Sequence, residues 1–247
     1  MSPPTVLIKG KPRVDRSLRE NLVLWRYLDT AKFFDFLHNK RLFFPRGDRF
    51  QDKFEGAFTR SLRRAIEEAY AKNKIDFTYE KFRTKLRERV FLNCWHLGPN
   101  DSMAMWRLYG QSPCSVAITT TVGRLRAALQ EQKLPFHVSI EKVSYVNHWR
   151  DPKLDISPYS RIFAYKLKAY AFEREVRVLI DRSIDEFDSE IDDTGIPIPV
   201  SLKTLLRSIV ISPEAENWFA QLVQAITGQN GVNAPVHRSK LSVESPI

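Results

Sequence analysis

Residues 176–180, with the sequence VRVLI, constrain the fold more than any other segment of the chain. Apolar side chains fall at both odd and even positions of this run, which is typical of a strand covered on both faces. Glu173 and Glu175 stand directly before it. Burying a carboxylate is costly unless a partner or a ligand offsets the loss of water. The sequence therefore predicts a sheet with layers on both sides, and a specific reason for two acidic groups at the mouth of one strand.

Strand-like and helix-like segments follow one another without strict alternation. Strand patterns occupy residues 21–28, 41–44, 90–97, 115–120, 136–146, 196–200, 208–212 and 235–241. Helical patterns start at a Thr30 cap and then occupy residues 52–73, 79–89, 100–110, 122–130, 159–170 and 214–227. This order predicts an α+β fold with a mixed, largely antiparallel sheet and peripheral helices. Without repeats or low-complexity tracts, we expect a single domain over residues 1–247, with a helical, basic insertion at about 52–90.

The charge balance favours anionic partners. Lysine and arginine outnumber aspartate and glutamate 39 to 29, which gives a formal net charge of +10. Nucleic acid or a nucleic-acid-associated protein is therefore an expected partner. Two cysteines, Cys94 and Cys114, exclude a disulfide scaffold and a four-cysteine zinc site, and no metal is expected. No apolar run is long enough for a signal sequence or a membrane span, so we expect a cytoplasmic protein without a membrane partner.

The two glutamates are candidate catalytic groups. On a continuous strand, Glu173, Glu175 and Arg177 share one face, with neighbours about 6–7 Å apart. The carboxylates raise each other's proton affinity, and the guanidinium opposes this effect. A fixed negative charge beside an anomeric carbon stabilises the oxocarbenium-like transition state of glycosidic bond cleavage. The alternative, an exposed strand end that pairs with surface lysines, remains open at this point.

Arg26 is a candidate anion clamp. It lies between Trp25 and Tyr27 in an apolar strand pattern, where a guanidinium needs an anionic partner. That partner is either a ligand phosphate or carboxylate, bound in bidentate fashion, or an internal carboxylate such as Asp52 or Glu55.

The stretch CWHLGPNDSMAMWRLYG concentrates aromatic side chains with polar edges: Trp95, His96, Trp106 and Tyr109. Together with Tyr27 they suit stacking on a nicotinamide or a base. Packing in the core is the alternative, and Cys94 with His96 makes only half of a zinc site.

Four segments together resemble a bacterial family catalogued as domain of unknown function 2971. They are LWRYLD, RLFFPRGDRFQDKFEG, CWHLGPNDSMAMWRLYG and KAYAFEREVRVL, and a later ISPEAENWFAQLV resembles the entry to the family's C-terminal helix. The resemblance covers roughly residues 22–241.

This family is in turn similar to ADP-ribosyltransferases, which implies their fold and NAD as a substrate. In that comparison Arg26 occupies the position that holds NAD, and Glu173 and Glu175 form the E-x-E motif, whose second glutamate is catalytic. The middle motif differs from that of ADP-ribosyltransferases, because Cys94 and His96 stand where serine or threonine is expected. The resemblance implies ADP-ribose transfer to a macromolecular acceptor, and a role as a toxin or phage-defence effector.

Two other functions fit the same residues. A nucleic-acid-binding module without catalysis would use the basic helices of residues 52–89. A metal-dependent nuclease would gather Asp52, Glu55, Glu173 and Glu175 around a divalent cation. The sequence leaves open the acceptor, the oligomeric state and whether the site is active or vestigial.

Overall fold

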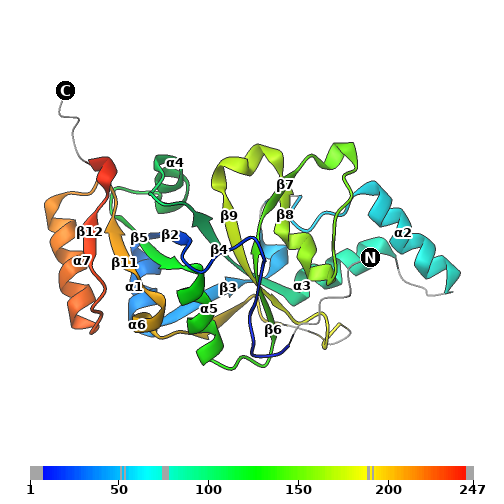
Figure 1. Cartoon of the computed structure of the whole chain (residues 1–247), viewed down its shortest axis with the longest axis horizontal. Helices are drawn as coiled ribbons and strands as arrows, with labels where there is room; N and C mark the ends of the chain where they lie inside the picture. Colours follow the sequence, from blue (N-terminus) through cyan, green and yellow to red (C-terminus); the bar gives the residue numbers. More distant parts are fainter. Residues whose placement is uncertain are drawn as a thin grey trace. The chain divides into compact units, whose positions relative to one another are not determined.

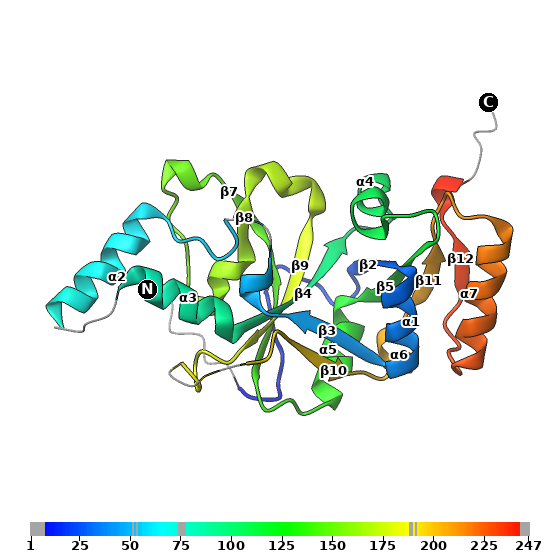
Figure 2. The same ribbon diagram turned by 180° about the vertical axis from the view of Figure 1, so that it is seen from behind.

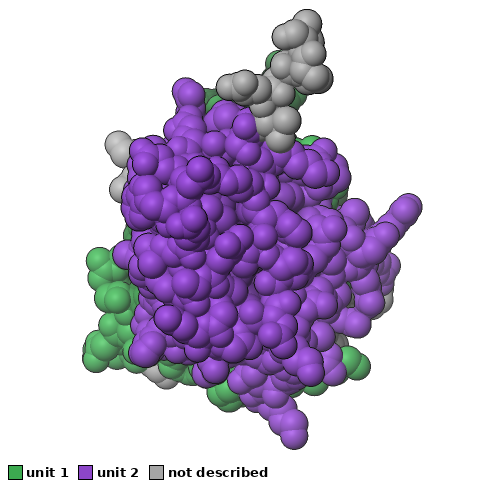
Figure 3. Space-filling view, turned by 90° about the vertical axis from the view of Figure 1, so that its left-hand side faces the viewer, with its two compact units in different colours: residues 1–15, 43–93, 134–196 green, residues 16–42, 94–133, 197–247 purple. Residues whose placement is uncertain are grey.

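The computed structural model describes residues 8–50, 52, 54–73, 78–187, 190 and 192–242. The chain forms two compact units that interleave along the sequence (Figure 3). Unit 1 contains residues 1–15, 43–93 and 134–196, and unit 2 contains residues 16–42, 94–133 and 197–247. The expected helical segment of residues 52–90 lies within unit 1. Each unit is described by itself below.

Unit 1 is built around strand β9 (Glu175–Asp181), in the strand order β1-β6-β9-β4. β6 (His137–Lys142) pairs antiparallel with β9, and β1 (Arg13–Val14) pairs parallel with β6. All seven residues of β9 are buried, which confirms the prediction of a strand covered on both faces.

The helical layer of unit 1 contains α2 (Arg60–Lys72) and α3 (Tyr79–Arg89) (Figure 1). The helix predicted over residues 79–89 is confirmed, whereas the one predicted over residues 52–73 begins only at Arg60. They turn a thin apolar stripe inward, with Ile66, Phe82 and Leu86 buried in a core cluster. Most of their basic residues lie on the remaining faces, as the sparse apolar pattern predicts, but Arg89 is buried and donates to the carbonyls of Glu186 and Lys85.

The helix predicted over residues 159–170 does not form. Two 3-10 segments, η4 (Tyr159–Ala164) and η5 (Lys168–Glu173), flank the short strand β8 (Tyr165–Leu167) instead. β8 pairs in parallel with β7 (Ser144–Val146), so tertiary pairing overrides local helix propensity. The other short segments of unit 1 are η1 (Gly47–Arg49) and η3 (His148–Arg150).

Unit 2 contains a largely antiparallel arrangement in the order β4-β2-β5-β11-β12. β2 (Val23–Asp29) pairs antiparallel with β5 (Ser115–Thr121) along its whole length, and β5 pairs antiparallel with β11 (Ser208–Ile211). Only the β11 pairing with β12 (Val236–Arg238) is parallel. The predicted α+β class with a mixed, largely antiparallel sheet is confirmed.

Helices cover the strands of unit 2, and α7 runs beside β12 in both views (Figures 1 and 2). The helical segments are α1 (Thr30–Asn39), α4 (Met103–Met105), the π-helical turn η2 (Trp106–Gly110), α5 (Val122–Glu131), α6 (Leu202–Leu205), α7 (Asn217–Gln229) and η6 (Lys240–Ser242). Asp29, and not Thr30, caps α1, because its side chain accepts from the Lys32 backbone amide at 2.8 Å.

Three strands pass from one unit to the other: β3 (Arg41–Pro45), β4 (Val90–Leu97) and β10 (Gly195–Pro199). β3 and β10 pair with each other in a separate two-stranded sheet. None of the helices in the described part of the chain combines the length and apolar character needed to cross a bilayer.

Candidate active site

The two glutamates lie on either side of a sharp backbone turn. Glu173 ends η5, Arg174 adopts the left-handed conformation with φ 45°, and Glu175 begins β9. Both glutamate side chains are buried. The expectation that they continue one strand is wrong, because the left-handed residue between them interrupts the extended backbone.

Arg177 joins Glu175 to Glu55. Its guanidinium is fully buried and donates through Nε to Glu175 Oε2 at 2.6 Å. Nη1 and Nη2 donate to the two carboxylate oxygens of Glu55, with 3.2 Å between Nη2 and Oε2. Nη1 also donates to the Phe163 carbonyl at 2.6 Å. This paired geometry is what allows a guanidinium to remain charged in a protein interior.

A tight turn places Glu55 against Arg177. Asp52 Oδ1 accepts from the Phe54 amide at 2.9 Å, and the Glu55 amide donates to the Asp52 carbonyl at 3.0 Å. Gly56 follows with φ 65°, and a Cβ there would lie 2.9 Å from Phe163 Cε1. Only glycine satisfies both the backbone angle and the close approach of the ring. The FEG sequence therefore serves to position one carboxylate.

Lys166 of β8 binds both glutamates of the E-x-E motif. Its Nζ donates to Glu173 Oε2 and lies 3.3 Å from Glu175 Oε1. Burial lowers the pKa of Lys166, but the charges of Glu175 and Glu173 more than offset this, so the pKa lies above its ordinary value. The lysine is therefore a permanent cation at neutral pH.

The carboxylate of Glu175 is held in its ionised form. Burial raises the pKa of Glu175, but Arg177 and Lys166 lower it by more, so the pKa lies below its ordinary value. The Tyr145 hydroxyl accepts from the Glu175 backbone amide at 2.7 Å. Burial, followed by the nearby Glu175 and Glu173 charges, raises the pKa of Tyr145, which therefore stays protonated.

These side chains form what we call the β9 charge network: Glu55, Lys166, Glu173, Glu175 and Arg177. Three carboxyl groups meet two cations, and the hydrogen bond between Glu173 and Glu175 places a proton between those two groups. In this buried setting the charge of the ionised Glu175 carboxylate is weakly screened, and it is fixed before any ligand arrives. The network can therefore stabilise positive charge that develops at its edge.

Acid is expected to weaken the contribution of Glu175 to stability. Its pKa in the folded protein lies below the ordinary value of 4.5, which applies to the unfolded chain. Its stabilising effect is thus fully present above about pH 4.5 and is lost as pH falls through the lower folded-state value. Urea unfolding of wild type and Glu175→Gln at pH 7 and below 4.5 measures the difference in unfolding free energy. That difference should shrink in acid, and a constant difference would contradict the assignment.

Arg26 in unit 2 is half-buried and has no carboxylate partner within the described residues. Its Nη1 donates to the Cys94 carbonyl at 3.2 Å, and its Cζ lies 5.9 Å from the centroid of the Trp95 ring. Burial lowers the pKa of Arg26, and the nearby Cys94 partly opposes this effect. Glu55, one partner considered for Arg26, is instead bound by Arg177 within unit 1. Arg26 therefore keeps most of its donors available for an anion.

The predicted aromatic group is divided between the two faces of the sheet in unit 2. The β2–β4 register aligns Trp25 with His96, so the alternation of strand side chains places His96 with Tyr27 and Trp95 with Arg26. Tyr27 packs edge-on against the buried Trp106, with ring centroids 4.8 Å apart, and lies 6.3 Å from the His96 ring.

The aromatic residues on the same face as Tyr27 pack in the core. The Tyr27 hydroxyl accepts from the Ser102 amide at 2.9 Å, and Trp106 Nε1 donates to Asp101 at 3.0 Å. Tyr109, at the end of the same chain segment, is instead 42% exposed at the surface. Of the predicted ligand-binding aromatic residues, Trp95 is the one that shares a face with Arg26.

Sequence reasoning missed two members of the site, Lys166 and Tyr145. Tyr145 lies within the strand predicted over residues 136–146, but that pattern does not indicate a contact with Glu175. β8, which carries Lys166, has only three residues, too few to show the alternation that identifies a strand. Tyr145 and Lys166 both lie close to Glu175 because β7 pairs with β8, which places Tyr145 opposite Lys166.

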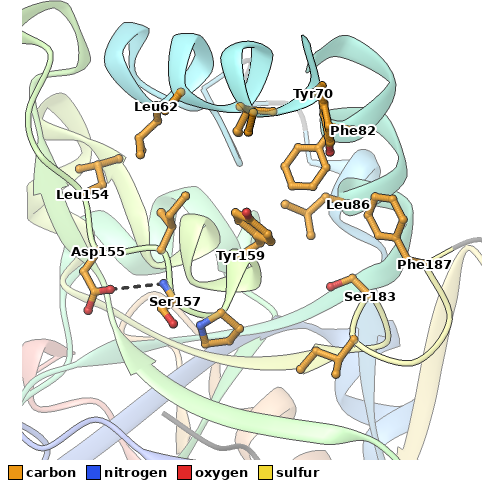
Figure 4. Close-up of a pocket in the computed structure, with 16 residues that line it drawn as sticks. Leu62, Tyr70, Phe82, Leu86, Leu154, Asp155, Ser157, Tyr159, Ser183 and Phe187 are labelled. Atoms are coloured by element: carbon orange, nitrogen blue, oxygen red, sulfur yellow. Dashed lines mark hydrogen bonds between the residues drawn. The ribbon is translucent and has the colours of Figure 1, made fainter. Parts of the chain in front are cut away.

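Unit 1 also has an open apolar pocket of about 790 Å³ between α2, α3 and the loop before η4 (Figure 4). Leu62, Phe82 and Tyr159 line it, and Asp155 Oδ1 accepts from the Ser157 amide at 3.3 Å at its rim. None of the predicted site residues lines this pocket.

No protein-family model matches the chain, and no curated protein matches it. The resemblance to the 2971 family therefore stays a prediction. Two solved structures of DarT from Thermus sp. 2.9 are similar to it at 11% sequence identity. The complex with ADP-ribosylated ssDNA has a TM-score of 0.41 and covers 91% of this chain and 96% of that chain. The complex with carba-NAD+ has a TM-score of 0.39 and covers 90% and 97%. At such low TM-scores neither likeness assigns an activity to this chain.

Proposed function

We propose that this protein is an ADP-ribosyltransferase-like protein that binds NAD and transfers ADP-ribose to a macromolecular acceptor. The β9 charge network carries this proposal, because it supplies an ionised carboxylate, Glu175, fixed by Arg177 and Lys166. The E-x-E pattern of Glu173 and Glu175 and the resemblance to ADP-ribosyltransferases point in the same direction.

The proposed chemistry needs a fixed negative charge. Cleavage of the bond between nicotinamide and ribose leaves the electron pair on nicotinamide and positive charge on the ribose ring. Glu175 would stabilise that charge and hydrogen-bond a ribose hydroxyl, while Glu173, Lys166 and Arg177 hold it in place. The acceptor then forms a bond to the anomeric carbon and loses a proton.

In unit 2 we assign Arg26 to the anionic pyrophosphate of NAD. Trp95 is 2% exposed and holds Arg26 by a cation–π contact, so its stacking on NAD stays a prediction. The assignments of Tyr27, His96, Trp106 and Tyr109 stay predictions. So do the cytoplasmic location and the toxin or phage-defence role. The net charge of +10 supports a nucleic acid, or a protein bound to one, as the acceptor.

Two alternatives have less support. The metal-dependent nuclease requires free carboxylates, whereas Arg177 and Lys166 already bind Glu55, Glu173 and Glu175. In the nucleic-acid-binding module on the helices of residues 52–89, one cation is neutralised, because Arg63 pairs with Glu67 and Glu80. The carbonyls of residues 55 and 56 accept from Arg87 and Arg83 and fix those guanidinium groups without removing their charge.

Nicotinamide release from NAD by the purified protein tests the proposal. Glu175→Gln should lower the rate on the order of 100-fold, because an uncharged amide cannot stabilise the developing cation. Glu67→Gln on the exposed face of α2 is the matched control and should release nicotinamide at the wild-type rate.

Circular dichroism establishes that both variants are folded. Equal release by wild type and Glu175→Gln, or no release by wild type with nucleic acid and protein acceptors, would contradict the proposed function.

A further inference from the structure

Two adjoining cavities in unit 2 are bordered by cations. The first, of about 490 Å³, is lined by Lys40, Arg124, Lys203 and Arg207, and by no aspartate or glutamate. The amide side chains of Asn230 and Asn233 lie in its wall, on the loop after α7. Residues far apart in the sequence thus concentrate positive charge around one hollow.

The second cavity, also of about 490 Å³, continues the first. Both are lined by Arg207 and Pro235, so the two cavities adjoin at these residues, and together we call them the β11–β12 groove. Its second half adds Arg238 and Lys240, together with His237. The one acidic residue that lines it, Asp101, is already engaged.

Asp101 forms no ion pair with these cations in the described part of the chain, although its negative charge remains. Its Oδ2 accepts from Trp106 Nε1 at 3.0 Å and from Ser239 Oγ at 2.5 Å. The groove therefore carries six formal positive charges and one negative charge, a net of +5 in a chain whose total is +10. Half of the excess charge of the protein is concentrated here.

Most of this charge is not used by the fold. The side chains of Lys40, Lys203 and Arg207 are exposed, and they have no ion-pair partner among the residues that the structure describes. Arg124 is anchored, since it donates to the carbonyls of Lys203 and Leu206 at 2.6 and 2.5 Å. Carbonyl acceptors fix the direction of a guanidinium without removing its charge.

Arg238 is anchored in the same way, so the groove is lined both by anchored arginines and by exposed cations without an ion-pair partner in the described part of the chain. Arg238 Nη1 donates to the Ala215 carbonyl at 2.9 Å, and Nη2 donates to Asn217 Oδ1 at 2.6 Å. Lys240 and His237 beside it have no partner in the described part of the chain. Several cations around adjoining cavities suit the phosphates of a nucleic-acid backbone, which need charge neutralisation and little directional precision.

We propose that the β11–β12 groove binds the phosphates of a single-stranded nucleic acid. Each cavity falls within the range of roughly 300–1,000 Å³ that small-ligand sites occupy. Two in series accommodate consecutive nucleotides, whereas a lone nucleotide needs only one. The apolar walls at Val232 and Pro235 offer surfaces for bases without reading their edges. A positively charged groove of this kind binds a strand irrespective of its sequence.

The proposed nucleic-acid contact lies in unit 2, and not on the helices of residues 52–89, where basic residues are densest in the sequence. It does not rest on NAD chemistry, because it concerns binding at a surface of unit 2 alone. Failure of NAD turnover would leave it intact, and failure of strand binding would leave the role of Glu175 intact.

The test is fluorescence anisotropy with a fluorescein-labelled thymidine oligonucleotide of about 20 residues, longer than the strand one such groove covers. Wild type is compared with the triple variant Lys40→Gln/Lys203→Gln/Arg207→Gln. We expect affinity to fall at least about 10-fold at low salt. The plot of log K against log salt should become less steep by about 2, because each of the three lost phosphate contacts contributes roughly 0.7 to its slope.

The matched control removes the same charge elsewhere: Arg60→Gln/Arg64→Gln/Lys72→Gln, on the exposed face of α2. Its affinity should stay within about 2-fold of wild type if the groove is the site. All six positions are exposed, so both variants should keep the wild-type melting temperature. Equal weakening in both variants, or none in the groove variant, would overturn the proposal. Thymidine monophosphate competing as strongly as the unlabelled oligonucleotide would also overturn it, and would indicate a site for free nucleotides.

Discussion

Replacing Arg177 with methionine should destabilise the protein by about 3–5 kcal/mol at pH 7. The guanidinium is fully buried, and its loss would leave the carboxylates of Glu55 and Glu175 in the interior without their main partner. An uncompensated buried charge is among the largest single-residue costs in a folded protein. Urea unfolding monitored by tryptophan fluorescence measures the change.

A second substitution separates lost charge pairing from lost packing. Arg177→Met/Glu55→Gln removes one stranded carboxylate, so it should recover part of the stability that Arg177→Met loses. Arg63→Met, which breaks exposed pairs on α2, should change the unfolding free energy by less than about 1 kcal/mol. If the double variant is no more stable than Arg177→Met, the cost does not come from the unpaired charge.

The sequence predicts the acidic part of this network and its arginine, but not how they are held. Glu173, Glu175 and Arg177 are neighbours in the chain, so their proximity follows from spacing alone. Glu55 meets Arg177 across 122 positions, and Lys166 meets both glutamates through a three-residue strand. Contacts of this kind depend on how segments pack in three dimensions, which periodicity within a single segment cannot report.

The prediction of secondary structure succeeds where one local signal dominates. Residues 90–97 form a strand with the predicted bounds, because their apolar run has no competing helical pattern. Residues 159–170 contain a run that is compatible with a helix, but β8 gains its hydrogen bonds from β7, and the Phe163 carbonyl is taken by Arg177. Tertiary partners decide such segments.

Net charge indicates that an anion is bound but not where. Basic residues are densest in the segment that forms α2 and α3, where Glu67 and Glu80 neutralise Arg63. The β11–β12 groove instead gathers cations from segments near residues 40, 203 and 240, none of which is unusually basic alone. The location of a charged surface is therefore a property of the fold.

Phe163→Ala is expected to cost about 3–5 kcal/mol, since the ring is fully buried in the core cluster of unit 1. The ring also fills the space against Gly56, where a Cβ would lie 2.9 Å from its edge. Gly56 follows Glu55, and the Phe163 carbonyl accepts from Arg177, so the cavity would open beside two members of the β9 charge network. Thermal and urea unfolding measure the loss.

Two control variants determine whether the ring acts on the site or only on stability. Phe172→Ala removes the same ring from a side chain that is 49% exposed, and should change the unfolding free energy by less than about 1 kcal/mol. Phe163→Leu keeps an apolar group in the cavity and should recover most of the loss. If the ring positions Glu55, the acid dependence of Phe163→Leu should differ from that of wild type, because a displaced Glu55 alters the charge around Arg177 and Glu175. If the unfolding free energies of Phe163→Leu and wild type depend on pH in the same way, Phe163 contributes only packing. The β9 charge network is then held in place by its own hydrogen bonds.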